Sequence, residues 1–226
     1  MPDLLQIDAV LLDYGRVLGL APRDQDFETL RGTSGINAAA FPAAFWKYRD
    51  LYDRGSLDGP AFWGMIARDA NISFTSQRIE ELIAQDIQLW IHPNPVMVRW
   101  ARLLRQRGVK TAVLSNMPRE HSRFLARNAK WLQAFNHLCF SGELKCAKPD
   151  AAIYRACLEG LHVPAAQALF IDDYEIHARG ASAVGLHSLV FHSVERLEKD
   201  LEPFGLAESF AEAVASLAND EAGSGK

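Results

Sequence analysis

Five short apolar runs, separated by longer stretches of helical pattern, organise this chain. They lie at 7–12, 109–114, 137–140, 168–171 and 188–191, and the run at 137–140 is the weakest. Short apolar runs bounded by turn residues are typical of strands that are buried on both faces. The pattern therefore predicts a parallel sheet that is covered on both sides.

Helical patterns separate the later runs. One begins at Asn94 and Pro95 by cap and first-turn chemistry, and Gly108 ends it. Another begins at Asp150 and ends before Pro164. Because strand and helix alternate from about residue 93 onward, we expect an α/β protein with a Rossmann-like parallel sheet.

Residues 21–92 interrupt this alternation. They contain no convincing strand, and four helical stretches fit them, the clearest at 79–90. We therefore predict an α/β core of residues 1–20 and 93–226 with an inserted all-helical cap of residues 21–92. A doubly wound sheet binds ligands beyond the carboxyl ends of its strands, so this cap is expected to lie over the site.

Composition narrows the class of protein. The 226 residues are 49% hydrophobic and 23% charged, as in a folded globular chain, and no apolar stretch is long enough to span a membrane. A formal net charge of −4 argues against nucleic acid as a partner. Three cysteines without metal-binding spacing, and no recognisable signal peptide, favour a cytoplasmic protein. We expect a monomer or a homodimer.

Polar residues that could take part in binding or catalysis lie after several of the predicted strands. The carboxyl ends of parallel strands meet at one edge of a sheet, so these residues are expected to lie together. The candidates are Asp13, Ser115 with Asn116, Lys148, and Asp172 with Asp173.

Taken singly, each candidate has a purely structural alternative. Ser115 and Asn116 could begin the following helix, and Lys148 could be a solvated loop lysine. Asp172 with Glu175 three residues later resembles a capping box. The hypothesis of a site therefore depends on all of them arriving at one edge.

Together the candidates suit phosphoryl transfer. Carboxylates from two strands can hold Mg²⁺, which prefers oxygen ligands, while a lysine and a hydroxyl neutralise phosphoryl oxygens. Asp13 could then attack phosphorus and form an aspartyl-phosphate, dividing the reaction into two easier steps.

The order of these motifs resembles a known superfamily. The segments Leu-Leu-Asp13-Tyr-Gly-Arg-Val-Leu, Leu-Ser115-Asn116, Lys148-Pro-Asp and Phe-Ile-Asp172-Asp173 are similar to the four motifs of the haloacid dehalogenase-like (HAD) superfamily. The helical insertion lies where subfamily I carries its type-1 cap. The resemblance implies a Rossmann-like core and a Mg²⁺-dependent hydrolase acting on a small phosphorylated metabolite.

The resemblance also implies residue roles. Asp13 would be the nucleophile and a metal ligand, together with the Gly15 carbonyl oxygen and Asp173. Asp172 would contact the metal indirectly, through a water molecule.

Phosphate binding is implied for the remaining motif residues. Ser115 and Lys148 would bind the phosphoryl group, helped by backbone N–H groups around Tyr14, Gly15 and Asn116. Arg16 follows the nucleophile and could reach the substrate or form a surface salt bridge.

One position departs from the pattern. Most phosphatases of the superfamily carry an acid–base aspartate two residues after the nucleophile, where this chain has Gly15. A branch resembling bacterial glucose-1-phosphate phosphatases also has glycine there, but Arg16 replaces the asparagine of that branch. General acid–base help is worth roughly 10²–10⁴-fold, so we expect slow turnover of alkyl phosphates and a preference for good leaving groups.

Two other functions stay open. A metal-free 2-haloacid dehalogenase would also use Asp13, although the Asp172–Asp173 pair favours a metal. A non-catalytic binder of phosphorylated ligands would account for the missing acid. Polar-edged and aromatic cap residues suit a sugar or a second anion, or else pack the helices together; they are Trp46, Tyr48, Arg49, Tyr52 and Arg54.

Overall fold

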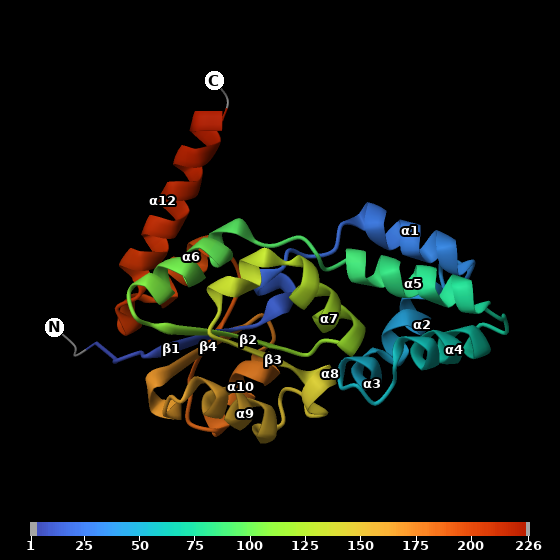
Figure 1. Ribbon diagram of the computed structural model, residues 1–226, viewed down its shortest axis with the longest axis horizontal. Coiled ribbons are helices and arrows are strands. Elements are labelled where there is room, and N and C mark those ends of the chain that lie inside the picture. The colour runs from blue at the N-terminus through green and yellow to red at the C-terminus, as the bar shows by residue number, and fades with distance from the viewer. Residues whose placement is uncertain (1–3, 225–226) are drawn as a thin grey trace.

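A five-stranded parallel sheet forms the centre of the computed structural model, which describes residues 4–224 and the side chains as far as residue 217 (Figure 1). The strands are β1 (Ala9–Leu12), β2 (Lys110–Ser115), β3 (His137–Phe140), β4 (Ala168–Asp172) and β5 (His187–Val190), in the order β3-β2-β1-β4-β5. The predicted α/β class is confirmed, and the weak run at 137–140 forms the edge strand β3.

Side-chain alternation along β1 supplies both faces of the sheet. Val10 and Leu12 belong to one hydrophobic cluster, and Ala9 and Leu11 belong to another. Successive side chains of a strand point to opposite faces, so a run of four apolar residues must be covered on both sides. The chain therefore has two core layers, one on each side of the sheet.

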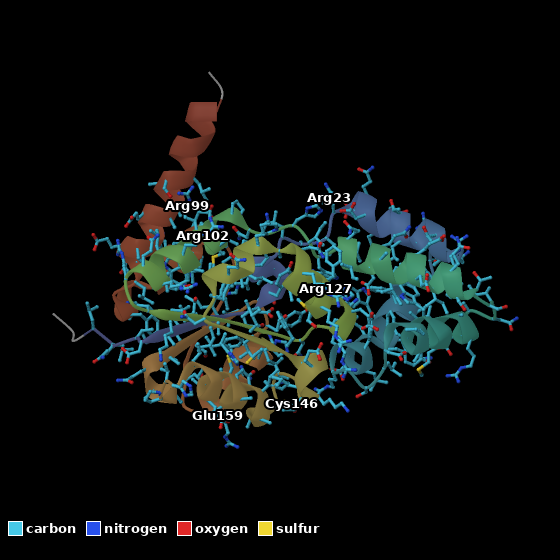
Figure 2. The ribbon with its side chains drawn as sticks, in the orientation of Figure 1. Arg23, Arg99, Arg102, Arg127, Cys146 and Glu159 are labelled. Atoms are coloured by element: carbon cyan, nitrogen blue, oxygen red, sulfur yellow. The ribbon has the colours of Figure 1, made fainter. Side chains whose placement is uncertain are left out.

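Helices cover these two faces (Figure 1). The first face packs against α6 (Pro95–Gln106) and α12 (Ala207–Ser224), and the second packs against α9 (Ala151–Leu161) and α10 (Glu175–Ala183). Figure 2 shows Glu159 on the outer side of α9, away from the sheet. The other core helices are α7 (Arg119–Asn128), α8 (Ser141–Leu144) and α11 (Val194–Asp200), with short turns at Tyr14–Leu18, Lys130–Ala134, Ala165–Gln167 and Glu202–Phe204.

The inserted segment contains five helices where the sequence predicts four. They are α1 (Asp24–Ser34), α2 (Phe41–Lys47), α3 (Arg49–Asp53), α4 (Gly59–Asp69) and α5 (Ser76–Gln88). Only Tyr48, with φ −110° and ψ 4°, separates α2 from α3, and buried aromatic residues continue on both sides of it. These helices enclose their own hydrophobic cluster and lie beside the sheet's carboxyl edge (Figure 1).

Two chain crossings join the insertion to the core, and they run side by side. The Leu20 amide donates to the His92 carbonyl oxygen at 2.8 Å, and the Asn94 amide donates to the Leu18 carbonyl oxygen at 2.7 Å. Asn94 also caps α6 as predicted, since its side chain accepts from the Val96 amide at 3.2 Å.

The predicted division into residues 1–20 with 93–226 and 21–92 stays a prediction; its residues 1–3 and 225–226 lie outside the described part. None of the helices within residues 4–224 has the length and apolar character needed to cross a membrane.

Candidate active site

Three strands deliver the predicted site residues to the same edge of the sheet. Asp13 follows β1, and Ser115 and Asp172 are the last residues of β2 and β4. The register pairs Leu12 with Val113 on one side and with Ile171 on the other, so β1 is flanked by the two strands. The side chains that follow these pairs therefore face one common space.

A buried lysine bridges the carboxylates at the ends of β1 and β4. The Nζ of Lys148 donates to Oδ1 of Asp13 and to Oδ2 of Asp172, each at 2.6 Å. The lysine side chain is 1% exposed. Lys148 is therefore not the solvated loop lysine of the structural alternative; it bridges two carboxylates.

The charges of this cluster shift one another's pKa values. Burial outweighs Lys148 and raises the pKa of Asp13 above its usual value, and Asp172 raises it further. Burial also opposes ionisation of Asp172, yet Lys148 and His177 hold its pKa below the usual value. Burial alone would lower the pKa of Lys148, but the two carboxylates raise it. The lysine therefore stays charged while Asp13 is held in an unfavourable environment for an anion.

Asp173 completes a group of three carboxylates. Ligand oxygens of Asp13, Asp172 and Asp173 lie within 4.8 Å of one another. Burial, then the neighbouring Asp13 and Asp172, raise the pKa of Asp173 to about 6. Three carboxylates face one lysine, and a divalent cation would offset the excess negative charge with the oxygen ligands that Mg²⁺ prefers. The donor set thus fits a Mg²⁺ ion.

The backbone turn after Asp13 places Gly15 and Arg16 at this space. Gly15 has φ −61° and ψ 126°, which any residue can adopt, whereas Arg16 has φ 59° in the left-handed region. A Cβ atom added to Gly15 would lie 3.9 Å from Oδ2 of Asp13 and 3.7 Å from the ring of Trp90. A side chain at this position would therefore point beside the Asp13 carboxylate, and nothing in the backbone requires glycine there.

Asn116 shapes the site through its side chain. Its Nδ2 donates to the Lys148 carbonyl oxygen at 2.9 Å, and its Oδ1 accepts from the Lys148 amide at 2.8 Å. The side chain thus holds the backbone that carries the lysine. Contact of the Asn116 backbone N–H with substrate stays a prediction, as does the contact from Ser115, which is buried beside the same space.

Two site residues escape the sequence analysis. The Nδ1 of His177 lies 3.0 Å from Oδ1 of Asp172, which also accepts from the Tyr174 amide at 2.8 Å. Asp172 therefore does not form the capping box with Glu175. His177 lies in the first turn of α10, five residues after Asp172. This short separation is the one feature of the sequence that could have indicated a contact between the two side chains. Trp90, which flanks Gly15, lies at the end of the insertion and had no such signal.

A cavity of about 670 Å³ extends from the carboxylates to the helices of the insertion. Its core end is lined by Asp13, Tyr14, Gly15, Arg16, Ser115, Asn116, Lys148 and Asp173. Its other wall comes from α2, α3 and α7 and includes Trp46, Arg49, Asp50, Asp53 and His121. All predicted site residues except Asp172 thus line one cavity, and Asp172 lies directly behind Lys148.

The arginine of the second wall belongs to a buried charge network. The Nε of Arg49 donates to Oδ1 of Asp53 at 2.7 Å, and its Nη1 donates to both oxygens of Asp86 at 2.9 and 3.1 Å. The Nε2 of His121, from α7, lies 3.5 Å from Oδ2 of Asp86. Burial, opposed by Arg49, raises the pKa of Asp53 to about 6. This network joins the insertion to the core.

A second ion pair crosses between the same parts of the chain. The Nη1 of Arg54 donates to Oδ2 of Asp150 at 2.7 Å, and its Nε donates to Asp50 at 3.0 Å. Asp150 occupies the predicted N-cap position of α9, but its side chain makes no capping hydrogen bond. The carboxylate pairs with the arginine of the insertion instead.

Comparison with known proteins places the chain in a family. Residues 29–185 match the family described as haloacid dehalogenase-like hydrolase. A mouse protein, acyl-CoA dehydrogenase family member 10 (Mus musculus), is 31% identical over 110 residues, which are 48% of this chain and 10% of that protein. Mouse haloacid dehalogenase-like hydrolase domain-containing protein 3 is 35% identical over 95 residues, 42% of this chain and 38% of that protein. The chain therefore spans well under half the length of these relatives.

A solved structure shares the fold. The HAD family enzyme bt-2542 of Bacteroides thetaiotaomicron, crystallised with magnesium and inorganic phosphate, superposes with a TM-score of 0.68. The match covers 82% of this chain and 94% of that chain at 21% identity. At this identity the likeness establishes the fold, and the chemistry must be argued from the residues.

Proposed function

The chain belongs to the haloacid dehalogenase-like hydrolase family, and we propose that it is a Mg²⁺-dependent phosphohydrolase acting on a small phosphorylated metabolite. One observation carries the proposal. The carboxylate of Asp13 is hydrogen-bonded to the buried Lys148 and clustered with Asp172 and Asp173. A nucleophile, a fixed cation and a metal donor set thus occupy one end of a single cavity.

Asp13 is the proposed nucleophile. One of its oxygens forms a bond to phosphorus while the bond from phosphorus to the leaving oxygen breaks, producing an aspartyl-phosphate and a leaving-group anion, which takes a proton from water where it is basic enough to need one. Water then forms a new bond to phosphorus and releases Asp13 and inorganic phosphate. Its raised pKa reflects a poorly solvated anion, which is suited to attack once the opposing charges are arranged around it.

Lys148 and the metal share the charge of the phosphoryl group. Lys148 lies against Asp13 and can hydrogen-bond to an oxygen of the incoming phosphate. Bound Mg²⁺, held by Asp13, Asp173 and the Gly15 carbonyl oxygen, with Asp172 acting through water, would screen the approach of two anions. His177 and the Tyr174 amide fix the orientation of Asp172.

The position of Gly15 governs which substrates turn over well. No side chain there protonates the leaving oxygen, although a Cβ would lie 3.9 Å from Oδ2 of Asp13. Leaving groups that need little protonation, such as those of an acyl phosphate or an anomeric sugar phosphate, are therefore favoured.

The test is phosphate release by the purified chain over a panel of phosphorylated metabolites and acetyl phosphate, with Mg²⁺ and with EDTA. We expect release with Mg²⁺, loss of activity in EDTA, and recovery when excess Mg²⁺ is restored. Chloride release from 2-chloropropionate without Mg²⁺ would assign the dehalogenase function instead. Absence of release from every substrate, together with phosphate binding, would assign a non-catalytic binder. A cytoplasmic location stays a prediction that cell fractionation can test.

A further inference from the structure

The two ends of the active-site cavity are expected to bind different parts of the substrate. At the core end, Lys148 and the proposed metal meet the phosphoryl group. The far wall, formed by α2, α3 and α7, must accept whatever the phosphate is attached to. The cavity volume of about 670 Å³ leaves room for a leaving group the size of a sugar or an aromatic ring.

Arg49, which lines the cavity, and Arg54, which follows α3 and lies outside the lining, both already have anionic partners. Arg49 is bound by Asp53 and Asp86, and its side chain is 9% exposed. Arg54 is bound by Asp50 and Asp150. Of these six groups, Arg49, Asp50 and Asp53 line the cavity, so that one guanidinium group stands against two carboxylates on the far wall.

This charge balance bears on the expectation of a second anion. A carboxylate or second phosphate on the substrate would meet Asp53, whose side chain is 19% exposed, and Asp50, whose side chain is 70% exposed; both line the cavity. Repulsion between like charges is strongest at the shielded Asp53, and Arg49 could bind the added anion only by giving up a partner it already has. The far wall therefore disfavours binding of an acidic leaving group.

Exposed apolar side chains gather at the same cavity. Trp46 is 51% exposed, Tyr174 is 55% exposed and Ile176 is 59% exposed, and all three line it. Trp46 comes from α2 of the insertion, whereas Tyr174 and Ile176 belong to the start of α10 in the core. Large apolar side chains left exposed beside a cavity mark a surface for an apolar or cationic ligand group.

We propose that the substrate is a phosphate monoester, or an acyl or anomeric phosphate, whose leaving group has no acidic function and presents a planar or apolar face to Trp46 and Tyr174. This substrate class rests on the proposed phosphohydrolase activity. Asp50 and Asp53 exclude leaving groups with a carboxylate or second phosphate, and they tolerate neutral or positively charged ones.

Three aryl phosphates with the same ring test the charge requirement, and the positive and negative ones are also similar in size. Phenyl phosphate, 4-(aminomethyl)phenyl phosphate and 4-carboxyphenyl phosphate carry a neutral, a positive and a negative group. We expect kcat/KM for the first two to exceed that for the carboxylate by at least about tenfold. Equal or faster turnover of the carboxylate would overturn the proposal.

Variants locate the effect. Asp50→Lys should reduce the preference against 4-carboxyphenyl phosphate at least severalfold, whereas Glu80→Lys, an exposed charge reversal on α5, should leave the preference unchanged. Trp46→Ala should lower kcat/KM for phenyl phosphate more than for acetyl phosphate, which is too small to reach the ring. An unchanged preference in Asp50→Lys, or an equal loss on both substrates in Trp46→Ala, would contradict the assigned wall.

Acetyl phosphate distinguishes a failure of the proposed substrate class from a failure of the proposed phosphohydrolase activity. Mg²⁺-dependent release from acetyl phosphate with the carboxylated ring as the best aryl substrate would refute the substrate class alone. Absence of release from all four compounds would instead refute the phosphohydrolase function.

Discussion

The chain contains two buried charge clusters that use the same residue types differently. In the core, Lys148 lies between Asp13 and Asp172, and the carboxylates of Asp13 and Asp173 open onto a cavity. In the insertion, Arg49 is enclosed by Asp53 and Asp86, and Asp86 is 0% exposed.

The difference lies in what each cluster leaves unsatisfied. The pKa of Asp13 is raised because burial outweighs the single lysine, and a ligand or metal can relieve this. Burial also opposes ionisation of Asp86, but Arg49 and His121 keep its pKa below the usual value. The first cluster is arranged to meet an incoming charge, whereas in the second Arg49 and Asp86 already satisfy each other and stabilise the packing of the insertion.

The sharpest test of this contrast is Asp13→Asn, which keeps the shape of the side chain and removes the proposed nucleophile. We expect phosphate release to fall by at least about 10³-fold. The melting temperature should stay equal or rise, because a carboxylate whose pKa is raised by burial destabilises the ionised folded state. Activity within tenfold of the parent protein would remove Asp13 from the mechanism.

The converse test is Asp86→Ala in the Arg49 cluster. Removing one partner of a buried ion pair leaves Arg49 partly uncompensated, so we expect a loss of about 3 kcal/mol in the free energy of unfolding. Chemical denaturation measures this loss, and activity at a temperature where the variant is folded should change less than tenfold.

Asp69→Ala is the matched control for that experiment. Asp69 pairs with Lys47 on the outside of the same group of helices, at 2.5 Å, and the lysine side chain is 57% exposed. Exposed pairs contribute less than about 1 kcal/mol. Equal destabilisation by both substitutions would contradict the structural role given to the Arg49 network.

A smaller effect is expected from restoring the missing acid with Gly15→Asp. The backbone at Gly15 suits any residue, and the new Cβ would meet only Trp90 and Asp13 at ordinary contact distances. Alkyl phosphates should then turn over roughly 10–100-fold faster, within the usual range for general acid–base help. Steady-state rates on an alkyl phosphate measure this, and Gly15→Asn is the control, since it fills the same volume without an acid. An equal increase in turnover rate in both variants would show that the slow turnover of the parent protein does not come from a missing proton donor at position 15.

The smallest expected effect concerns Arg16. Its φ of 59° is costly for arginine, whereas asparagine adopts this conformation more readily. Arg16→Asn should raise the free energy of unfolding by about 0.5 kcal/mol. If the guanidinium binds substrate as predicted, KM should rise severalfold while kcat is retained. An unchanged KM would leave Arg16 as a surface residue at the cavity mouth.

The sequence predicted the class of fold because burial leaves a pattern along the chain. Runs such as 168–171 had to be covered on both faces, and β4 is buried throughout. The place of Asp13 at the end of β1 follows from the same pattern, since parallel strands finish at one edge. These properties depend on neighbours along the chain, and for that reason the sequence determined them.

The tertiary structure alone decided which charges pair. Lys148 lies 135 positions from Asp13, Asp150 pairs with Arg54 although it stands where a cap was expected, and Trp90 flanks Gly15. Hydrophobic periodicity records which face of an element is buried, but it carries no information about the partner brought there by another element. The wall that we propose to distinguish neutral from acidic leaving groups therefore exists only because the tertiary structure brings the insertion and the core together.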